Sequence, residues 1–79
     1  LKIDRSFVRN VVHAYEDRAI VRGVIDIAHR LGLRTVAEGI EKPRQLEIMR
    51  DLGCDAGQGY LWTRPVPLEN LFLDQRGVS

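Results

Sequence analysis

The strongest constraint on the fold is a pattern that occurs twice along the chain. In each copy a helical stretch ends on a leucine and a glycine, at residues 31–32 and again at residues 52–53. A short stretch without helical periodicity follows, and it ends on a polar residue and a second glycine, at residues 38–39 and 58–59. Helix and strand in alternation build parallel α/β sheets and barrels. The repeat therefore predicts an α/β fold.

Two helices are predicted by the spacing of the apolar residues. The first ends before Gly32, a residue that readily adopts the left-handed conformation of a helix C-cap. We expect this helix to begin near residue 18, with Asp17 as its N-cap and acidic charge at the positive end of its dipole. The second helix is expected over residues 43–52, because Pro43 suits a first turn and Gly53 suits a C-cap.

Three strands are expected beside these helices, over residues 1–4, 33–37 and 54–60. The order is strand, helix, strand, helix, strand, and each crossover is long enough to connect parallel neighbours. We therefore expect a partial TIM-like barrel, with three parallel strands and two intervening helices.

The last part of the chain has a different pattern. Two prolines at positions 65 and 67 exclude a helix interior and a central strand, so a loop is expected there. The predicted organisation is a barrel core, a closing loop with a short helix, and a frayed tail, over residues 1–62, 63–74 and 75–79.

Length and charge narrow the classes of function. The 79 residues suffice for one small domain, and a net charge of +1 gives no field that would attract a nucleic acid polymer. The single cysteine, Cys54, has no partner for a disulfide, and no apolar run is long enough to span a bilayer, so we expect a cytoplasmic protein.

The extent of the predicted sheet suggests that the chain is a piece of a longer one. It opens within a strand at Leu1 and has no initiator methionine. A complete eightfold barrel takes about 200 residues or more, so this chain supplies roughly three eighths of one. An uncovered sheet favours association, and we expect a homo-oligomer or association with the missing part of the barrel.

Polar residues close to the carboxyl ends of the strands are the candidates for chemistry, because parallel α/β proteins gather their reactive groups there. Lys2 alternates with apolar neighbours, which places it on the other face of its strand. Glu38 precedes a glycine that permits close backbone approach, and Gln58 lies between two glycines. The glycines around Gln58 are equally consistent with tight packing. The secondary candidates for contact with a substrate are Asp4, Glu41, Gly59 and Tyr60.

Structural roles compete with several of these assignments. Asp4 is expected to cap a turn that begins at Ser6, and Glu41 to be an acidic first-turn residue of the second helix. Cys54 is expected to be a small buried apolar residue, since nothing near it in the sequence would lower its pKa. His13 and His29 lack metal-ligand spacing, and Trp62 and Phe72 have no basic groove beside them. We therefore assign no site to these four residues.

Three blocks of sequence closely resemble one known family. Residues 1–8 read Leu-Lys-Ile-Asp-Arg-Ser-Phe-Val, residues 36–41 read Val-Ala-Glu-Gly-Ile-Glu, and residues 52–55 and 58–61 read Leu-Gly-Cys-Asp and Gln-Gly-Tyr-Leu. Their order and spacing resemble the C-terminal part of EAL-domain cyclic-di-GMP phosphodiesterases, over residues 1 to about 71. The resemblance implies the last three strands of a TIM-like barrel, in an enzyme that hydrolyses cyclic di-GMP to the linear dinucleotide.

The resemblance also implies roles for individual residues. Lys2 matches the family lysine that holds the attacking water and the phosphate, Glu38 the glutamate near a metal-bound water, and Gln58 the glutamine that orients this group. Two divalent cations, Mg²⁺ or Mn²⁺, normally serve such a domain. The family's other metal ligands match no part of this chain, and Glu38 alone cannot hold a cation that takes several oxygen ligands. We therefore expect the chain by itself to be inactive and without a metal.

Two other functions remain open at this stage. A degenerate EAL domain would bind cyclic di-GMP, or a partner protein, as a non-catalytic receptor. A stand-alone interaction module would complete its sheet by oligomerising. The resemblance further implies sensory or cyclase domains upstream in the parent protein.

Overall fold

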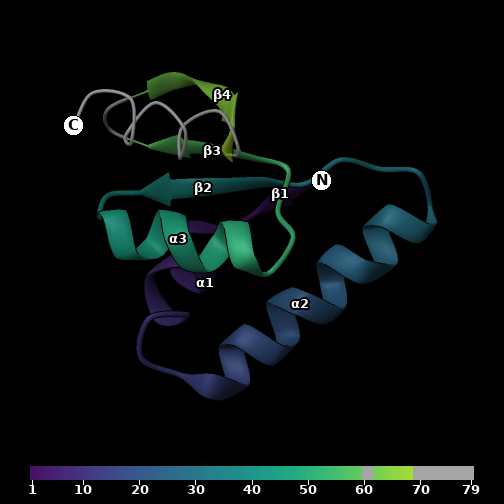
Figure 1. Ribbon diagram of the computed structural model, residues 1–79, viewed down its shortest axis with the longest axis horizontal. Helices are drawn as coiled ribbons and strands as arrows, with labels where there is room; N and C mark the ends of the chain where they lie inside the picture. Colours follow the sequence, from purple (N-terminus) through teal and green to yellow (C-terminus); the bar gives the residue numbers. More distant parts are fainter. Residues whose placement is uncertain (60–61, 69–79) are drawn as a thin grey trace.

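The structure is a computed structural model, and it describes residues 1–59 and 62–68 of the chain. Its sheet has the strand order β1-β2-β3-β4, in which the first three strands are parallel and β4 is antiparallel to β3. Figure 1 shows the helices on one side of β2 and the strands β3 and β4 on the other. In chain order the elements are β1 (Lys2–Ile3), α1 (Arg5–Asn10), α2 (Tyr15–Arg30), β2 (Val36–Ile40), α3 (Pro43–Asp51), β3 (Ala56–Gly59) and β4 (Trp62–Pro67).

The two predicted helices are present, and their carboxyl ends are closed as expected. Gly32 and Gly53 have φ angles of 75° and 96°. In each case the glycine and the residue after it donate backbone hydrogen bonds back to the last turn, with Leu33 N bound to Ala28 O at 2.8 Å and Cys54 N to Met49 O at 3.0 Å. This is the Schellman arrangement, which satisfies carbonyls that the helix leaves unpaired.

The beginnings of the helices required two corrections. α2 starts at Tyr15 with Ala14 as its N-cap, so the prediction that Asp17 caps it is wrong, and Asp17 lies in the first turn instead. The acidic charge of Asp17 still stabilises α2, because the first turn is near the positive end of the helix dipole. The six-residue helix α1 was expected only as a turn, and Asp4 caps it as predicted.

The strands begin later than expected. β2 starts at Val36 and not at residue 33, because residues 31–33 complete the C-cap of α2 and leave Leu33 exposed. β3 likewise starts at Ala56.

The loop expected around the two prolines is an antiparallel strand, β4. In the described sheet β4 occupies an edge, where a residue without an N–H costs no internal ladder hydrogen bond. Its register pairs Pro67 with Ala56 and Val66 with Gly57. The short helix and the tail predicted after residue 68, with Phe72, lie outside the described residues.

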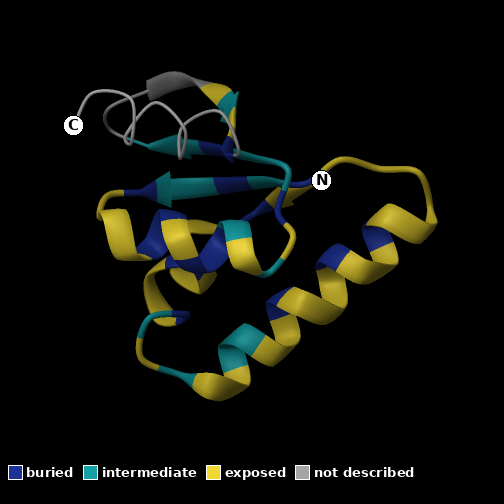
Figure 2. Cartoon of the chain, viewed as in Figure 1, coloured by how far each residue is buried: buried dark blue, intermediate teal, exposed yellow. Residues whose placement is uncertain are grey.

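The core lies between the sheet and the helices. Figure 2 shows buried residues in both α3 and β2, and a largely exposed α2. Among the described residues, no helix is long and apolar enough to cross a membrane. The buried apolar residues that form one cluster are Ile3, Val8, Val11, Val21, Ile25, Ala37, Ile40, Leu46, Ile48, Met49, Cys54 and Leu68.

Exposed apolar residues of α2 and of the segments beside it form a strip, which we name the α2 apolar strip. Its most exposed members are Ile27 and Leu31, at 61% and 70%. Two shallow hollows of about 190 and 170 Å³ lie along it, and Leu1 and Val24 line both. The strip consists of Leu1, Ile20, Val24, Ile27, Leu31 and Leu33.

Candidate functional site

The register of the three parallel strands decides which residues share a face of the sheet. Ile3 pairs with Ala37, and Ala37 pairs with Gly57, so these three residues form one row across the sheet. All three are buried, and Ile3 and Ala37 belong to the core cluster on the helix side. Because successive side chains of a strand point to opposite faces, the residues next to this row face away from the helices.

The three main candidates are all neighbours of this row. Lys2 precedes Ile3, whereas Glu38 and Gln58 follow the row by one residue on β2 and β3. Alternation therefore places all three on the face opposite the helices, with Lys2 displaced by two residues, about 7 Å, along the strand direction. Lys2 is exposed, and Glu38 and Gln58 are half-buried. The structure thus brings the three candidates onto one face, in neighbouring strands.

A β-bulge lies between Ala37 and Ile40, at Glu38 and Gly39. The pairs Ala37 with Gly57 and Ile40 with Gly59 enclose one more residue on β2 than on β3. The extra residue brings both Ala37 and Ile40 into the core, although they are three positions apart. Gly39 absorbs the distortion with a φ of 75°, and its missing side chain leaves room for Arg5, whose Cβ would lie 2.5 Å from an added Cβ. Bulges frequently re-aim a side chain at an active site.

The glycines beside Gln58 are explained by packing. A Cβ added at Gly57 would lie 2.5 Å from Leu68 Cδ2 and 2.6 Å from Ile40 Cδ1, and one added at Gly59 would overlap the carbonyl oxygen of Ile40. The alternative interpretation of these glycines, tight packing, is therefore correct.

The secondary candidates have local structural roles. The Asp4 carboxylate accepts hydrogen bonds from Ser6 N at 3.0 Å and Ser6 Oγ at 2.6 Å. These two bonds, the side-chain one first, lower the pKa of Asp4. Glu41 lies before the N-cap Lys42, so the prediction that it belongs to the first turn of α3 is wrong. Its N–H donates to the Gln45 Oε1 at 2.7 Å.

Tyr60, the remaining candidate, lies outside the described residues. For metal binding, no group of three or more His, Cys, Asp or Glu side chains occurs within residues 1–59 and 62–68. A divalent cation of the Mg²⁺ type takes about six oxygen ligands. The described residues therefore do not fit a metal site by themselves, and Glu38 is the main candidate ligand among them.

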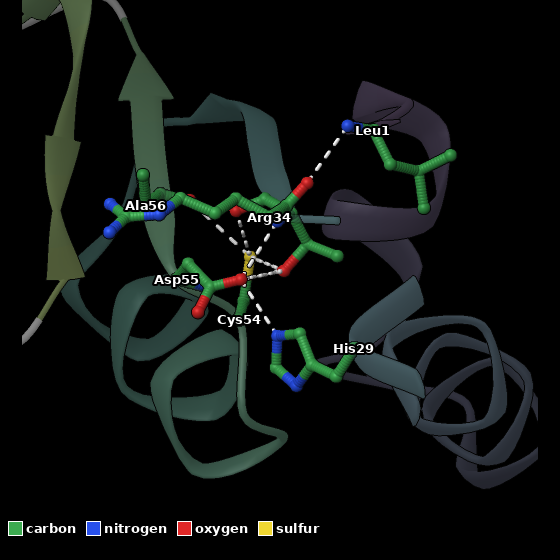
Figure 3. Close-up of polar contacts among 7 residues, drawn as sticks. Leu1, His29, Arg34, Cys54, Asp55 and Ala56 are labelled. Atoms are coloured by element: carbon green, nitrogen blue, oxygen red, sulfur yellow. Dashed lines mark hydrogen bonds and ion pairs between the residues drawn. The ribbon is translucent and has the colours of Figure 1, made fainter. Parts of the chain in front are cut away.

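A second polar cluster, which sequence reasoning missed, lies at the amino ends of β2 and β3. Figure 3 shows the His29 ring directed at the Asp55 carboxylate. The Asp55 Oδ2 accepts from His29 Nε2 at 2.7 Å, from Thr35 N at 2.8 Å and from Thr35 Oγ1 at 3.1 Å. In return Asp55 N donates to Thr35 Oγ1 at 3.2 Å. We name these three residues the His29–Thr35–Asp55 clamp.

Burial and hydrogen bonding act in opposite directions on the clamp carboxylate. Partial burial raises the pKa of Asp55, but the hydrogen bonds from His29 and Thr35 together outweigh it, and the pKa lies below its ordinary value. Beside the clamp, burial raises the pKa of the Cys54 thiol, which agrees with its predicted role as a buried apolar residue. The signal that could have identified the clamp is the repeat itself, because Thr35 precedes Glu38 by three residues and Asp55 precedes Gln58 by three residues.

Comparison with known proteins identifies the family. Residues 1–65 match the model of the EAL domain. The chain belongs to the EAL domain family. It is 44% identical over 71 residues to the cyclic di-GMP phosphodiesterase NbdA of Pseudomonas aeruginosa. The aligned region covers 90% of this chain and 9% of NbdA. The chain thus spans about a tenth of the length of that relative.

Solved EAL structures have the same fold over the matched part. The EAL enzyme Bd1971, in its cAMP- and cyclic-di-GMP-bound form, is 40% identical with a TM-score of 0.75, over 95% of this chain and 20% of the Bd1971 chain. Klebsiella pneumoniae BlrP1, in a complex with manganese and cyclic di-GMP, is 31% identical with a TM-score of 0.74, over 85% of this chain and 17% of BlrP1. EAL domains are TIM-like barrels, and this α/β chain corresponds to part of one.

Proposed function

We propose that this chain is part of an EAL domain that hydrolyses cyclic di-GMP to the linear dinucleotide. The observation that carries the proposal is the common face of Lys2, Glu38 and Gln58, in a chain that matches the EAL family over residues 1–65. The names of the relative NbdA and the ligand of Bd1971 support cyclic di-GMP as the substrate.

Each of the three residues suits one part of phosphodiester hydrolysis. The Glu38 carboxylate is an acceptor for a proton of the attacking water. The Lys2 ammonium stabilises negative charge that develops on the phosphate. The Gln58 amide donates and accepts hydrogen bonds, which lets it orient the water and the carboxylate together. Gly59, Tyr60, Asp4 and Glu41 are proposed as contacts to the substrate outside the reacting phosphate.

We propose that the complete domain uses Mg²⁺ or Mn²⁺, in agreement with the manganese in the BlrP1 complex. Such a cation would lower the pKa of a bound water and neutralise phosphate charge. Of the described residues Glu38 would supply one ligand, directly or through water, so the 79-residue chain alone is expected to bind no metal and to be inactive.

The proposed setting is a cytoplasmic signalling protein. Further sensory or cyclase domains in the same protein fit the small share of NbdA that the chain covers. The relative MucR is named a bifunctional diguanylate cyclase and phosphodiesterase, which supports the same arrangement.

The test is hydrolysis of cyclic di-GMP by the intact EAL domain and its Glu38→Gln variant. The substitution keeps the size of the side chain and removes its basicity, so we expect the rate to fall by about 10²- to 10⁴-fold. Glu47→Gln is the matched control, because Glu47 is an exposed glutamate of α3 that pairs with Arg44. Unchanged turnover in Glu38→Gln would remove the role assigned to Glu38.

The intact wild-type domain also separates the two main functions. Hydrolysis with Mg²⁺ or Mn²⁺ supports the phosphodiesterase. Binding of cyclic di-GMP without hydrolysis supports a receptor.

A further inference from the structure

The His29–Thr35–Asp55 clamp joins three segments that are distant in the sequence. His29 is on the last turn of α2, Thr35 directly precedes β2 and Asp55 directly precedes β3. The contacts span 26 residues between His29 and Asp55, and 20 between Thr35 and Asp55. Thr35 is fully buried, and the Asp55 side chain is 33% exposed. The clamp therefore connects the helix end and both strand beginnings in a partly water-excluded place.

The pairing of Thr35 and Asp55 is reciprocal. The backbone N–H of Thr35 donates to the side chain of Asp55, and the backbone N–H of Asp55 donates to the side chain of Thr35. The first backbone bond between the strands follows at once, from Ala56 N to Thr35 O at 3.1 Å. Such a pair holds one relative position of the two strands, because a slip by one residue would break both side-chain bonds.

On both strands, the clamp residue and the proposed site residue are separated by the same number of positions. Glu38 is three residues after Thr35, and Gln58 is three residues after Asp55. The register changes by one residue between Ala37 and Ile40, so the bulge follows the clamp and includes Glu38 and Gly39. A strand whose register slips by one residue exposes every side chain on the wrong face. A firm register before the bulge is thus what keeps Glu38 on the site face.

We propose that Asp55, through Thr35 and His29, is a positioning residue that sets the register of β2 against β3 and so aligns Glu38 with Gln58. The proposal rests on the function proposed above for Glu38 and Gln58. Asp55 itself is at the opposite end of both strands and does not contact the reacting atoms. Its effect on the reaction is transmitted through the two strands.

The experiment compares Asp55→Ala, Asp55→Asn and Ile25→Val in the intact domain. Asp55→Ala removes the carboxylate that accepts from His29 and Thr35. We expect kcat to fall by about 100-fold, as for a misplacement of about 1 Å, with KM changed less than about threefold. Asp55→Asn keeps an oxygen for Thr35 N and Oγ1, so it should recover most of kcat. Ile25→Val lowers stability from a buried position of α2 outside the clamp, and its folded fraction should keep the kcat of the wild type.

Two kinetic results would overturn the proposal. One is a kcat in Asp55→Ala that equals the kcat of Ile25→Val at matched folded fraction. The other is an equal loss in Asp55→Ala and Asp55→Asn, since the proposal requires the oxygen acceptor and not the charge.

A second readout does not depend on activity. We expect backbone amide exchange in Asp55→Ala to accelerate at Thr35 and also at Ala56, whose N–H makes the first ladder bond. Acceleration at Thr35 alone would show that the clamp does not hold the register, and would overturn the proposal. If the wild-type domain does not hydrolyse cyclic di-GMP, the proposed function fails, whereas the exchange result still decides the role of the clamp.

Discussion

The two ends of the parallel strands use polar residues in different ways. At the amino ends, Thr35 and Asp55 bind each other's backbone, and His29 closes the cluster. Toward the carboxyl ends, the side chain of Glu38 forms no hydrogen bond or ion pair with the residues that the structure describes. Barrel enzymes commonly separate stability at one end from chemistry at the other. The comparison shows that the role of a polar residue at a strand end depends on its hydrogen-bond partners and not on its residue type.

The largest expected effect concerns the crowded backbone beside Gln58. This is a packing feature at the carboxyl end, where the division above places chemistry and not stability. Gly59→Ala should lower the free energy of unfolding by about 3 kcal/mol, near the upper end for overpacking, because the new Cβ would overlap the Ile40 carbonyl. Denaturant unfolding of the intact domain measures it. Gly23→Ala is the control, since nothing lies within 4 Å of an added Cβ there, and stability should rise by up to about 1 kcal/mol. Equal stabilities of the two variants would contradict the crowding.

An intermediate effect concerns the pH dependence of the amino-end clamp. The folded-state pKa of Asp55 lies below the value of about 3.9 for an unfolded aspartate. Its stabilising contribution is therefore fully present above that value and is lost as the pH falls through the folded-state pKa. The difference in unfolding free energy between wild type and Asp55→Asn should shrink as the pH is lowered from 6 to below about 3.9.

Unfolding by urea at several pH values measures this difference. Asp26→Asn is the matched control, because Asp26 is 72% exposed and lies 3.9 Å from Arg30. A wild-type advantage over Asp55→Asn that stays constant down to pH 3 would show that the charge of Asp55 adds nothing to the amino end.

The smallest expected effect on stability concerns the α2 apolar strip, which belongs to neither strand end. Ile27→Glu should change the free energy of unfolding by less than about 0.5 kcal/mol, because Ile27 is 61% exposed. It should nevertheless reduce self-association of the 79-residue chain, since contiguous exposed apolar patches mark interaction surfaces. Sedimentation velocity measures the species present. Arg44→Glu adds acidic charge outside the strip and should leave association unchanged, whereas equal behaviour of both variants would exclude the strip as the contact.

Local patterns were sufficient for much of the fold and for the main candidates. The start of α3 was indicated by Pro43, and the ends of α2 and α3 by Gly32 and Gly53. Local sequence sufficed because capping depends on neighbouring residues along the chain. Alternation around Ile3 placed Lys2 on the face away from the helices, and the repeat located Glu38 and Gln58 on neighbouring parallel strands.

What only the tertiary structure decided depends on pairings between distant residues. The prolines of β4 exclude a central strand but not an edge, and their place at an edge follows from pairing with β3. The bulge at Glu38 exists because Ile40 and Gly59 pair out of step with Ala37 and Gly57. The clamp likewise joins residues 20 and 26 positions apart. A sequence shows each side chain's local propensity, whereas its hydrogen-bond partners are settled only when the strands and helices pack together.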